Sequence, residues 1–174
     1  EIQTGLGRTG KMFAYEHYGI LPDILTLGKG IGGGFALAAM LAHEKLNIFE
    51  KGEQGGTYSS QPLGMAVGYA VLQEIIKRNL TDNANKIGNM IIAQLNGLSR
   101  KYPIKDIRGK GLLLAFDTDG ENAARIVDMA FERGLILNSP GPSSIRIIPP
   151  LTVKEKHVFS FMEILEKVLK SVYS

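Results

Sequence analysis

The sequence predicts an α/β fold, with part of a larger α/β domain followed by a small α+β domain. A short apolar run, Ile24–Leu27, has the pattern of a buried strand and ends in a glycine-rich stretch. Two long segments with apolar residues at helical spacing follow, over residues 62–78 and 81–102. Towards the C-terminus, short strand patterns alternate with helices. We therefore expect the C-terminal part of the larger domain in residues 1–80, and a connecting helix plus the small domain in residues 81–174.

The composition excludes several classes of function. The chain has 174 residues, of which 44% are hydrophobic, enough for one domain or two small ones. With no cysteine there is neither a disulfide nor a thiolate metal site, and the three histidines lack ligand spacing. Lys and Arg number 20 against 17 acids but are scattered, which argues against nucleic-acid binding.

The chain shows no sign of a membrane anchor. No apolar run approaches the ~20 residues of a membrane span, and no signal peptide is visible. We expect a cytoplasmic protein. The sequence starts at Glu1 without a methionine, in what reads as the exit from a strand, so we expect it to be a piece of a longer chain.

The N-terminal half predicts several short elements before its first long helix. Residues 5–11 nearly match a P-loop, but Met12 replaces the hydroxyl residue that would bind Mg²⁺, which excludes an NTPase. We expect a short helix over residues 12–19, a second buried strand over 35–42, and a helix plus loop over 45–54. The helix over 62–78 starts with proline in its first turn. Its apolar face is expected to comprise Met65, Tyr69, Leu72 and Ile76.

The C-terminal half predicts an alternation of strands and helices. Thr81 is expected to cap the helix over residues 81–102. Strands are expected over 104–108, 112–117, 135–138 and 144–148, and a helix over 121–133. Thr152 and Glu155 form a capping box that opens the last helix. The apolar face of that helix comprises Val158, Phe161, Leu165, Val168 and Val172.

Lys29 is the first candidate for chemistry. It follows the strand 24–27 and stands among five glycines within residues 28–34. Glycine lets a ligand approach the backbone closely, and a lysine held partly dry there can lose its proton near neutral pH and act as an amine nucleophile. Two other interpretations stay open. Gly28, Gly30 and Gly33 match the dinucleotide fingerprint, which requires a following helix, and the stretch could also be a flexible loop with a solvated lysine.

Four segments in order give the sequence a family resemblance. They are residues 1–10 (EIQTGLGRTG), 22–30 (PDILTLGKG), 55–64 (GGTY, then PLG) and 145–151 (IRIIPPL). With these motifs the sequence resembles the class III aminotransferases, pyridoxal-phosphate (PLP) enzymes of fold type I. Acetylornithine, ornithine and 4-aminobutyrate aminotransferases belong to that family. The likeness extends over essentially the whole chain.

The resemblance implies a role for four residues. Lys29 matches the lysine that forms the Schiff base with PLP, and Gln3 the glutamine beside the phenolic oxygen of the cofactor. Thr57 matches the threonine that binds the cofactor phosphate, in the family usually from the neighbouring subunit, which implies a homodimer. Arg146 matches the arginine that clamps the α-carboxylate of the substrate, and its planar guanidinium suits that task. Without the resemblance, Gln3 and Thr57 read as loop residues and Arg146 as a surface arginine of a strand.

The implied activity is transamination of an amino acid with 2-oxoglutarate as acceptor, with the amino acid and the 2-oxo acid as small-molecule partners. A PLP-dependent racemase or mutase on the same scaffold is an alternative, as is a fragment that folds without cofactor. The family has an aspartate that pairs with the pyridinium nitrogen, directly before the glutamate that matches Glu1. We therefore expect the 174-residue chain alone to be inactive. The family often has serine where Gly56 stands and Gly-Asn where Ser60-Gln61 stand, so the sequence does not identify the amino donor.

Overall fold

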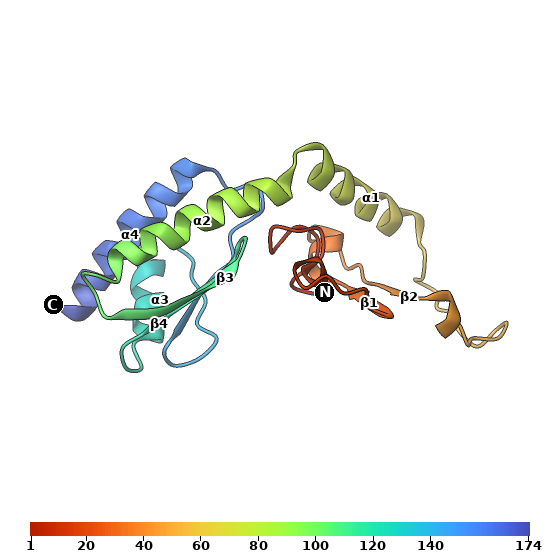
Figure 1. The fold of residues 1–174 in the computed structure, drawn as a ribbon, viewed down its shortest axis with the longest axis horizontal. Coiled ribbons are helices and arrows are strands. Elements are labelled where there is room, and N and C mark those ends of the chain that lie inside the picture. Colours follow the sequence, from red (N-terminus) through yellow and green to blue (C-terminus); the bar gives the residue numbers. More distant parts are fainter.

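The computed structural model describes all 174 residues, which form an arch with one group of elements at each end (Figure 1). The N-terminal group contains β1 (Ile24–Leu27), β2 (Ala39–Ala42) and α1 (Pro62–Lys77). The C-terminal group contains α2 (Leu80–Leu98), β3 (Ile104–Lys110), β4 (Leu113–Thr118), α3 (Ala123–Glu132), β5 (Ser144–Ile147) and α4 (Glu155–Tyr173). No helix is both long enough and apolar enough to cross a membrane.

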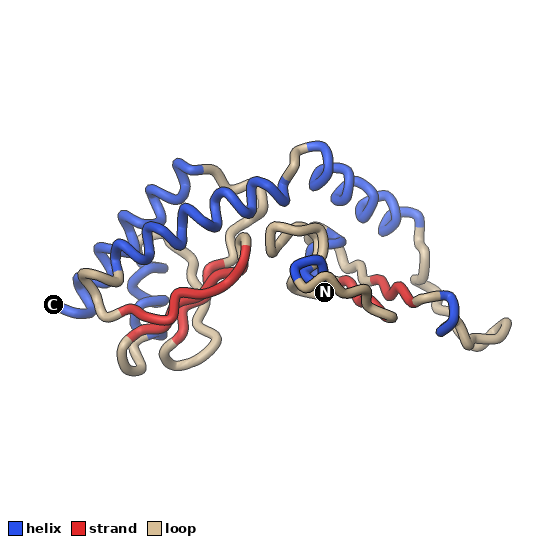
Figure 2. The backbone as a smooth tube through the Cα atoms, viewed as in Figure 1, coloured by secondary structure: helices blue, strands red, loops and turns tan.

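The C-terminal group is a layer of helices on one face of an antiparallel sheet (Figure 2). The strand order is β3-β4-β5, and Leu114 of β4 pairs with Ile147 of β5. Burial alternates along β4 because every second side chain points to the helices. A core of 21 buried residues, with Phe116 and Leu165 fully enclosed, joins the sheet to α2, α3 and α4. The apolar face expected for the last helix is confirmed, with Phe161 only partly buried.

The N-terminal group has a much smaller core. β1 and β2 form a two-stranded antiparallel sheet, and the buried apolar cluster has five members: Leu6, Leu27, Ile31, Ile75 and Leu80. The buried strand expected over residues 35–42 is therefore only partly correct. Its strand is confined to Ala39–Ala42, and three of these four residues are exposed because β2 pairs with β1 alone.

The apolar face expected for the first long helix is mostly wrong, because only Leu72 of its four residues packs against a buried cluster. Met65, Tyr69 and Ile76 of α1 are 45%, 67% and 56% exposed, and the buried residues are Gly64, Gly68 and Ile75. The reason is close packing: a Cβ atom on Gly68 would lie 2.8 Å from Cδ2 of Leu37. α1 thus packs Gly64 and Gly68, together with Val71 and Ile75, against the segment that follows Lys29.

Two helix starts also differ from expectation. Thr81 lies inside α2, which starts at Leu80 after Asn79, a residue with φ of 48°. α4 starts at Glu155, with Lys154 at the capping position. Thr152 is not the cap, because the chain turns there through a hydrogen bond from the Val153 N–H to the Pro150 carbonyl.

Two other expected elements are shorter than the sequence indicated. Residues 135–138 form no strand, and their one sheet contact is the bridge between Asn138 and Arg146. The helix expected within 45–54 is reduced to one turn at Glu44–Leu46, and the rest is exposed loop.

A close backbone contact joins the two groups. The Leu112 N–H donates to the Arg8 carbonyl at 2.9 Å, and the Asn85 amide donates to the Gly10 carbonyl at 2.8 Å. Gly111 lies so near this loop that a Cβ atom on it would come within 2.5 Å of the carbonyl carbon of Thr9. The N-terminal loop is therefore held against the turn before β4 and against α2.

Candidate active site

Lys29 lies directly after β1, at the start of a short 3-10 helix formed by Lys29–Gly32. Its backbone has a φ of 43°, a left-handed conformation that non-glycine residues adopt at a cost. Gly28 before it is extended and buried, with Ile2 packed where its side chain would be. The side chain of Lys29 itself is exposed, not partly dry as the sequence suggested.

Gln3 and Lys29 line one cavity, of about 640 Å³. Its walls come from the N-terminal turn, the glycine-rich loop, α1 and the segment after β5, which contributes Ile148 and Pro150. The structure thus brings together two of the four residues that the sequence singled out. No second lysine lines this cavity.

Glu1 fixes the turn that carries Gln3. Its carboxylate accepts a hydrogen bond from the Thr4 hydroxyl at 2.5 Å and one from the Tyr15 N–H at 2.9 Å. Burial opposes the negative charge, but the hydrogen bonds from Thr4 and from the backbone of Ala14 and Tyr15 outweigh it and lower the pKa of Glu1. The carboxylate is therefore a fixed acceptor that orients the turn.

Arg146 lies in the middle of β5, on the face of the sheet opposite the helices. Its neighbours Ile145 and Ile147 point into the core, so the guanidinium points the other way. There it lines a second cavity of about 480 Å³, together with Thr4, Thr9 and His17. The Nε of Arg146 is buried and has no hydrogen-bond partner. A buried donor without a partner is costly, and a carboxylate would satisfy it.

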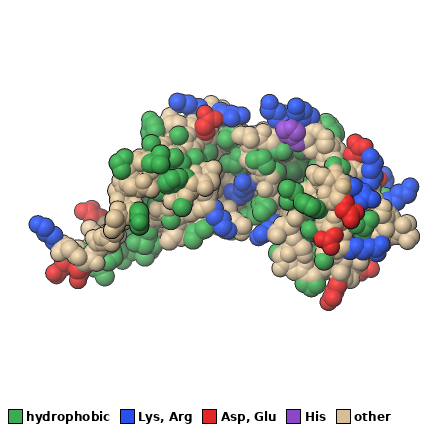
Figure 3. Space-filling model, turned by 180° about the vertical axis from the view of Figure 1, so that it is seen from behind, with side chains coloured by type: hydrophobic (Ala, Val, Ile, Leu, Met, Phe, Trp, Pro, Cys, Tyr) green, Lys and Arg blue, Asp and Glu red, His purple; other side chains and the backbone are tan.

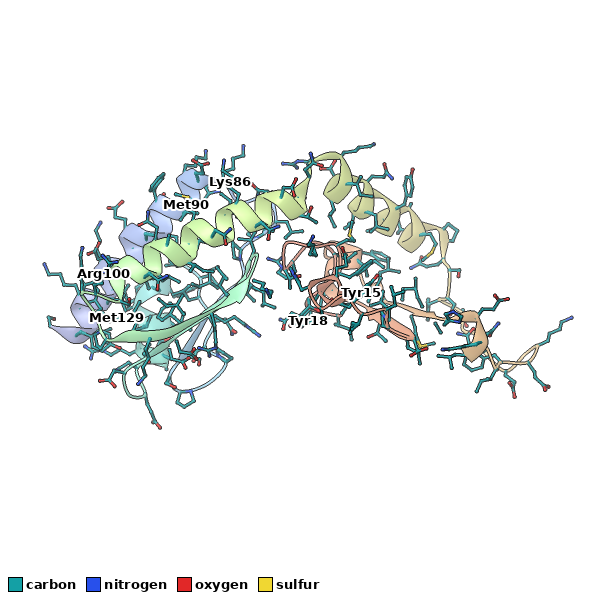
Figure 4. All side chains as sticks on the ribbon, viewed as in Figure 1. Tyr15, Tyr18, Lys86, Met90, Arg100 and Met129 are labelled. Carbon is teal, nitrogen blue, oxygen red and sulfur yellow. The ribbon has the colours of Figure 1, made fainter.

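The two cavities lie on either side of the N-terminal turn, since Gln3 lines one and its neighbour Thr4 the other. Arg146 is thus not in the Lys29 cavity itself. Tyr18, labelled in Figure 4 on the N-terminal group, also lines the Arg146 cavity. His17 forms a hydrogen bond with Thr9 through its Nε2 at 3.1 Å.

Thr57 is not brought near the other three residues. It belongs to the exposed loop between β2 and α1, which projects away from the rest of the chain in Figure 1. All residues from 47 to 60 are exposed, and Thr57 lines neither of the two cavities.

Comparison with known proteins decides the family. A profile of the class III aminotransferases matches residues 1–169. The chain belongs to this family. It is 43% identical over 173 residues to the acetylornithine aminotransferase of Caldanaerobacter subterraneus subsp. tengcongensis, covering 99% of this chain and 44% of that enzyme. The chain therefore spans less than half the length of the curated relatives it matches.

Solved structures agree with this assignment. The acetylornithine aminotransferase of Elizabethkingia anophelis superposes with a TM-score of 0.91 at 32% identity, over 98% of this chain and 46% of that one. The ornithine δ-aminotransferase of Plasmodium falciparum gives a TM-score of 0.91 at 35% identity, with the same coverage. The resemblance stated from the motifs is confirmed, and so is the mixed α/β fold of the class III aminotransferases.

The residues present fit the cofactor that this family implies. The Lys29 cavity offers an accessible amine beside the Gln3 amide, and the Arg146 cavity offers a buried donor without a partner. Sequence reasoning missed one residue at this site. Arg8 lines the Lys29 cavity and bonds two carbonyls of the C-terminal group. Its signal was an arginine within a glycine-rich loop, with no acid near it in sequence.

Proposed function

We propose that this chain supplies the lysine, the cofactor-side glutamine and the substrate-binding arginine of a PLP-dependent aminotransferase. The proposed substrates are an amino acid of the acetylornithine, ornithine or 4-aminobutyrate type and 2-oxoglutarate as acceptor. The observation that carries the proposal is Lys29, held in a left-handed backbone conformation at a strand end in the same cavity as Gln3. Membership of the class III family supports it.

When bound, PLP supplies an electron sink for the charge left on the substrate carbon as its proton departs. Lys29 would hold the cofactor through its Nζ amine. Once substrate has freed that amine, the same Nζ would act as the base that takes the proton from the substrate Cα and would return it to C4′, the cofactor carbon on the other side of the substrate nitrogen. The amide of Gln3 would lie beside the phenolic oxygen of the cofactor and donate to it.

Arg146 binds the α-carboxylate of both substrates in turn. Its guanidinium presents parallel N–H donors that match the two carboxylate oxygens, so it orients the carboxylate as well as attracting it. The unpartnered Nε is the observation that favours this role over that of a surface arginine. A strand with buried side chains on either side of Arg146 gives the clamp a rigid support.

Thr57 is proposed to bind the phosphate of a cofactor held by a second copy of the chain. Its place in an exposed, projecting loop supports a role outside its own subunit. The homodimer and the cytoplasmic location stay predictions. We also propose a domain boundary between residues 80 and 81, which the separate apolar clusters on either side support.

Chemical labelling tests the proposal. Borohydride treatment of the holoenzyme that carries this chain, in the presence of PLP, should attach the cofactor to Lys29. Lys11 is the matched control, since it also follows a glycine and is exposed. Peptide mass spectrometry that finds the cofactor on Lys11, or on any lysine other than Lys29, would refute the assignment. Lys29→Ala should abolish labelling and transamination, whereas Lys11→Ala should leave both unchanged.

Product analysis distinguishes transamination from a racemase or mutase reaction on the substrate amino acid. An aminotransferase forms a new oxo acid from the amino donor and glutamate from 2-oxoglutarate. A racemase or mutase forms neither.

A further inference from the structure

Arg8 bonds one carbonyl next to the start of β4 and one shortly after the end of β5, the strand that carries Arg146. Its Nη1 donates to the Pro149 carbonyl at 2.5 Å and to the Leu112 carbonyl at 3.3 Å. Leu112 comes directly before β4 and Pro149 comes shortly after β5. The register that pairs Leu114 with Ile147 places these two carbonyls opposite each other at the same end of the sheet. One guanidinium therefore spans the β4–β5 pair at its end.

Arg8 also contacts the part of the site that contains Lys29. Arg8 lines the cavity that holds Gln3 and Lys29, and its carbonyl accepts the Leu112 N–H. No carboxylate lies within ion-pair distance of Arg8, and burial lowers the pKa of its guanidinium. Burying a cation against neutral carbonyls carries a desolvation cost, so Arg8 is a poor device for stability alone.

We propose that Arg8 is a positioning residue for substrate binding. It holds the end of β5 at a fixed place relative to the Lys29 loop, so that Arg146 binds the substrate carboxylate at a fixed distance from Lys29. This inference rests on the proposed function. In this role Arg8 acts through Pro149, three residues after Arg146, and not through a bond of its own to the carboxylate.

Binding of an unreactive dicarboxylate measures this role without turnover. The probe is glutarate, titrated calorimetrically into the PLP-loaded holoenzyme that carries this chain. Loss of a charged hydrogen bond that fixes the clamp should raise the Kd of glutarate about tenfold in Arg8→Ala. The KM of both substrates should rise by a similar factor, with a smaller change in kcat. The absorbance of PLP held by Lys29 should not change, because the substitution leaves the loop that carries Lys29 in place.

A double-mutant cycle shows whether Arg8 acts through Arg146. If it does, Arg8→Ala should raise the Kd of glutarate in the parent and leave it unchanged in an Arg146→Ala background. Arg133→Ala is the matched control. It removes an arginine that also donates to a backbone carbonyl, Met129 O at 2.9 Å, on an exposed helix end far along the chain, and it should leave Kd, KM and absorbance unchanged. Should Arg8→Ala fail to fold, Arg8→Lys carries the same cycle with a smaller expected rise.

The outcomes separate this inference from the proposed function. Equal effects of Arg8→Ala in the two backgrounds, or loss of PLP together with glutarate, overturn the positioning role and leave the clamp intact. If Arg146→Ala itself leaves the Kd of glutarate unchanged, the carboxylate clamp of the proposed function fails, and the inference fails with it.

Discussion

The two ends of the arch differ in how many of their large apolar side chains are exposed. Of the nineteen exposed large apolar residues, fifteen lie in residues 1–80 and four in the remainder of the chain. The C-terminal group instead encloses a core of 21 residues. Figure 3 shows the apolar side chains gathered on the surface of the N-terminal group. The N-terminal group thus leaves most of its large apolar side chains uncovered, whereas the C-terminal group encloses its own.

This difference has a functional consequence. The strained lysine and the projecting loop lie in the group with the small core, and Arg146 lies in the group with the large one. The proposed carboxylate clamp, Arg146, thus lies on a sheet that packs against its own core. The Lys29 loop is held by short-range contacts and by the junction with the C-terminal group.

Truncating one phenylalanine in each group gives the largest expected contrast. Phe116 in β4 is fully buried, and Phe49 in the loop after β2 is 54% exposed. Phe116→Ala should lower the free energy of unfolding by about 3–5 kcal/mol, because it removes buried contacts and leaves a cavity. Phe49→Ala should change it by less than about 0.5 kcal/mol. Urea denaturation of the 174-residue chain measures both, and equal losses would contradict the comparison.

Adding one methyl group at the junction tests how the two groups are joined. Gly111 has a φ of 55°, and its Cβ would overlap the backbone of Thr9 and Gly10. Gly134 has a φ of 77° and open space where its Cβ would be. Gly134→Ala should cost only the strain of a left-handed alanine, about 1–3 kcal/mol. Gly111→Ala should cost more, since it adds the overlap to the strain.

The measurement is thermal unfolding followed by circular dichroism, with amide hydrogen exchange at Leu112 as a local readout. Exchange at Leu112 should quicken in Gly111→Ala because its hydrogen bond to the Arg8 carbonyl is lost. Similar melting temperatures for the two variants would mean that the junction yields easily, and that the groups are less firmly joined than the contact distances indicate.

Part of this architecture could be predicted from the sequence, and the physical reason differs by region. Most helices and strands of the C-terminal group follow their apolar periodicity because that group buries its own faces, although the strand expected over residues 135–138 does not form. α1 is apolar on most sides, so periodicity alone could not choose its buried face, and the choice of Met65, Tyr69 and Ile76 was wrong. The decisive feature was the pair Gly64 and Gly68, small residues one helical turn apart.

The candidate site shows the same limit. Lys29 could be singled out from its glycines, and the family motifs pointed to Gln3, Thr57 and Arg146. Arg8 stood within one of those motifs, but its role depends on carbonyls more than a hundred positions away in sequence. Such long-range bonds leave no local pattern.

The smallest expected effect is on the pH dependence of stability, and it involves a polar contact of the C-terminal group. Asp117 accepts hydrogen bonds from the Ser144 hydroxyl and, at 3.0 Å, from Arg108. The bond from Ser144 and then the one from Arg108 lower the pKa of Asp117, against the opposing effect of desolvation. A carboxyl group whose pKa is lower in the folded chain stabilises it above the unfolded pKa near ~3.9, and that contribution fades as the pH falls through the folded value.

Asp117→Asn should therefore lower the free energy of unfolding at pH 7 by at most about 1 kcal/mol, since the Asp117 side chain is 24% exposed and its Arg108 partner 43% exposed. The difference from the parent should shrink below about pH 4, where the parent carboxylate also becomes protonated. Asp128→Asn on α3 is the control, because Asp128 is exposed and forms no ion pair. Urea denaturation at pH 7 and pH 3 checks both variants. If Asp117→Asn lowers the free energy of unfolding equally at pH 3 and pH 7, the loss comes from the shape of the Asp117 contact and not from its charge. The losses at Asp117 and at Phe116 would then both come from packing.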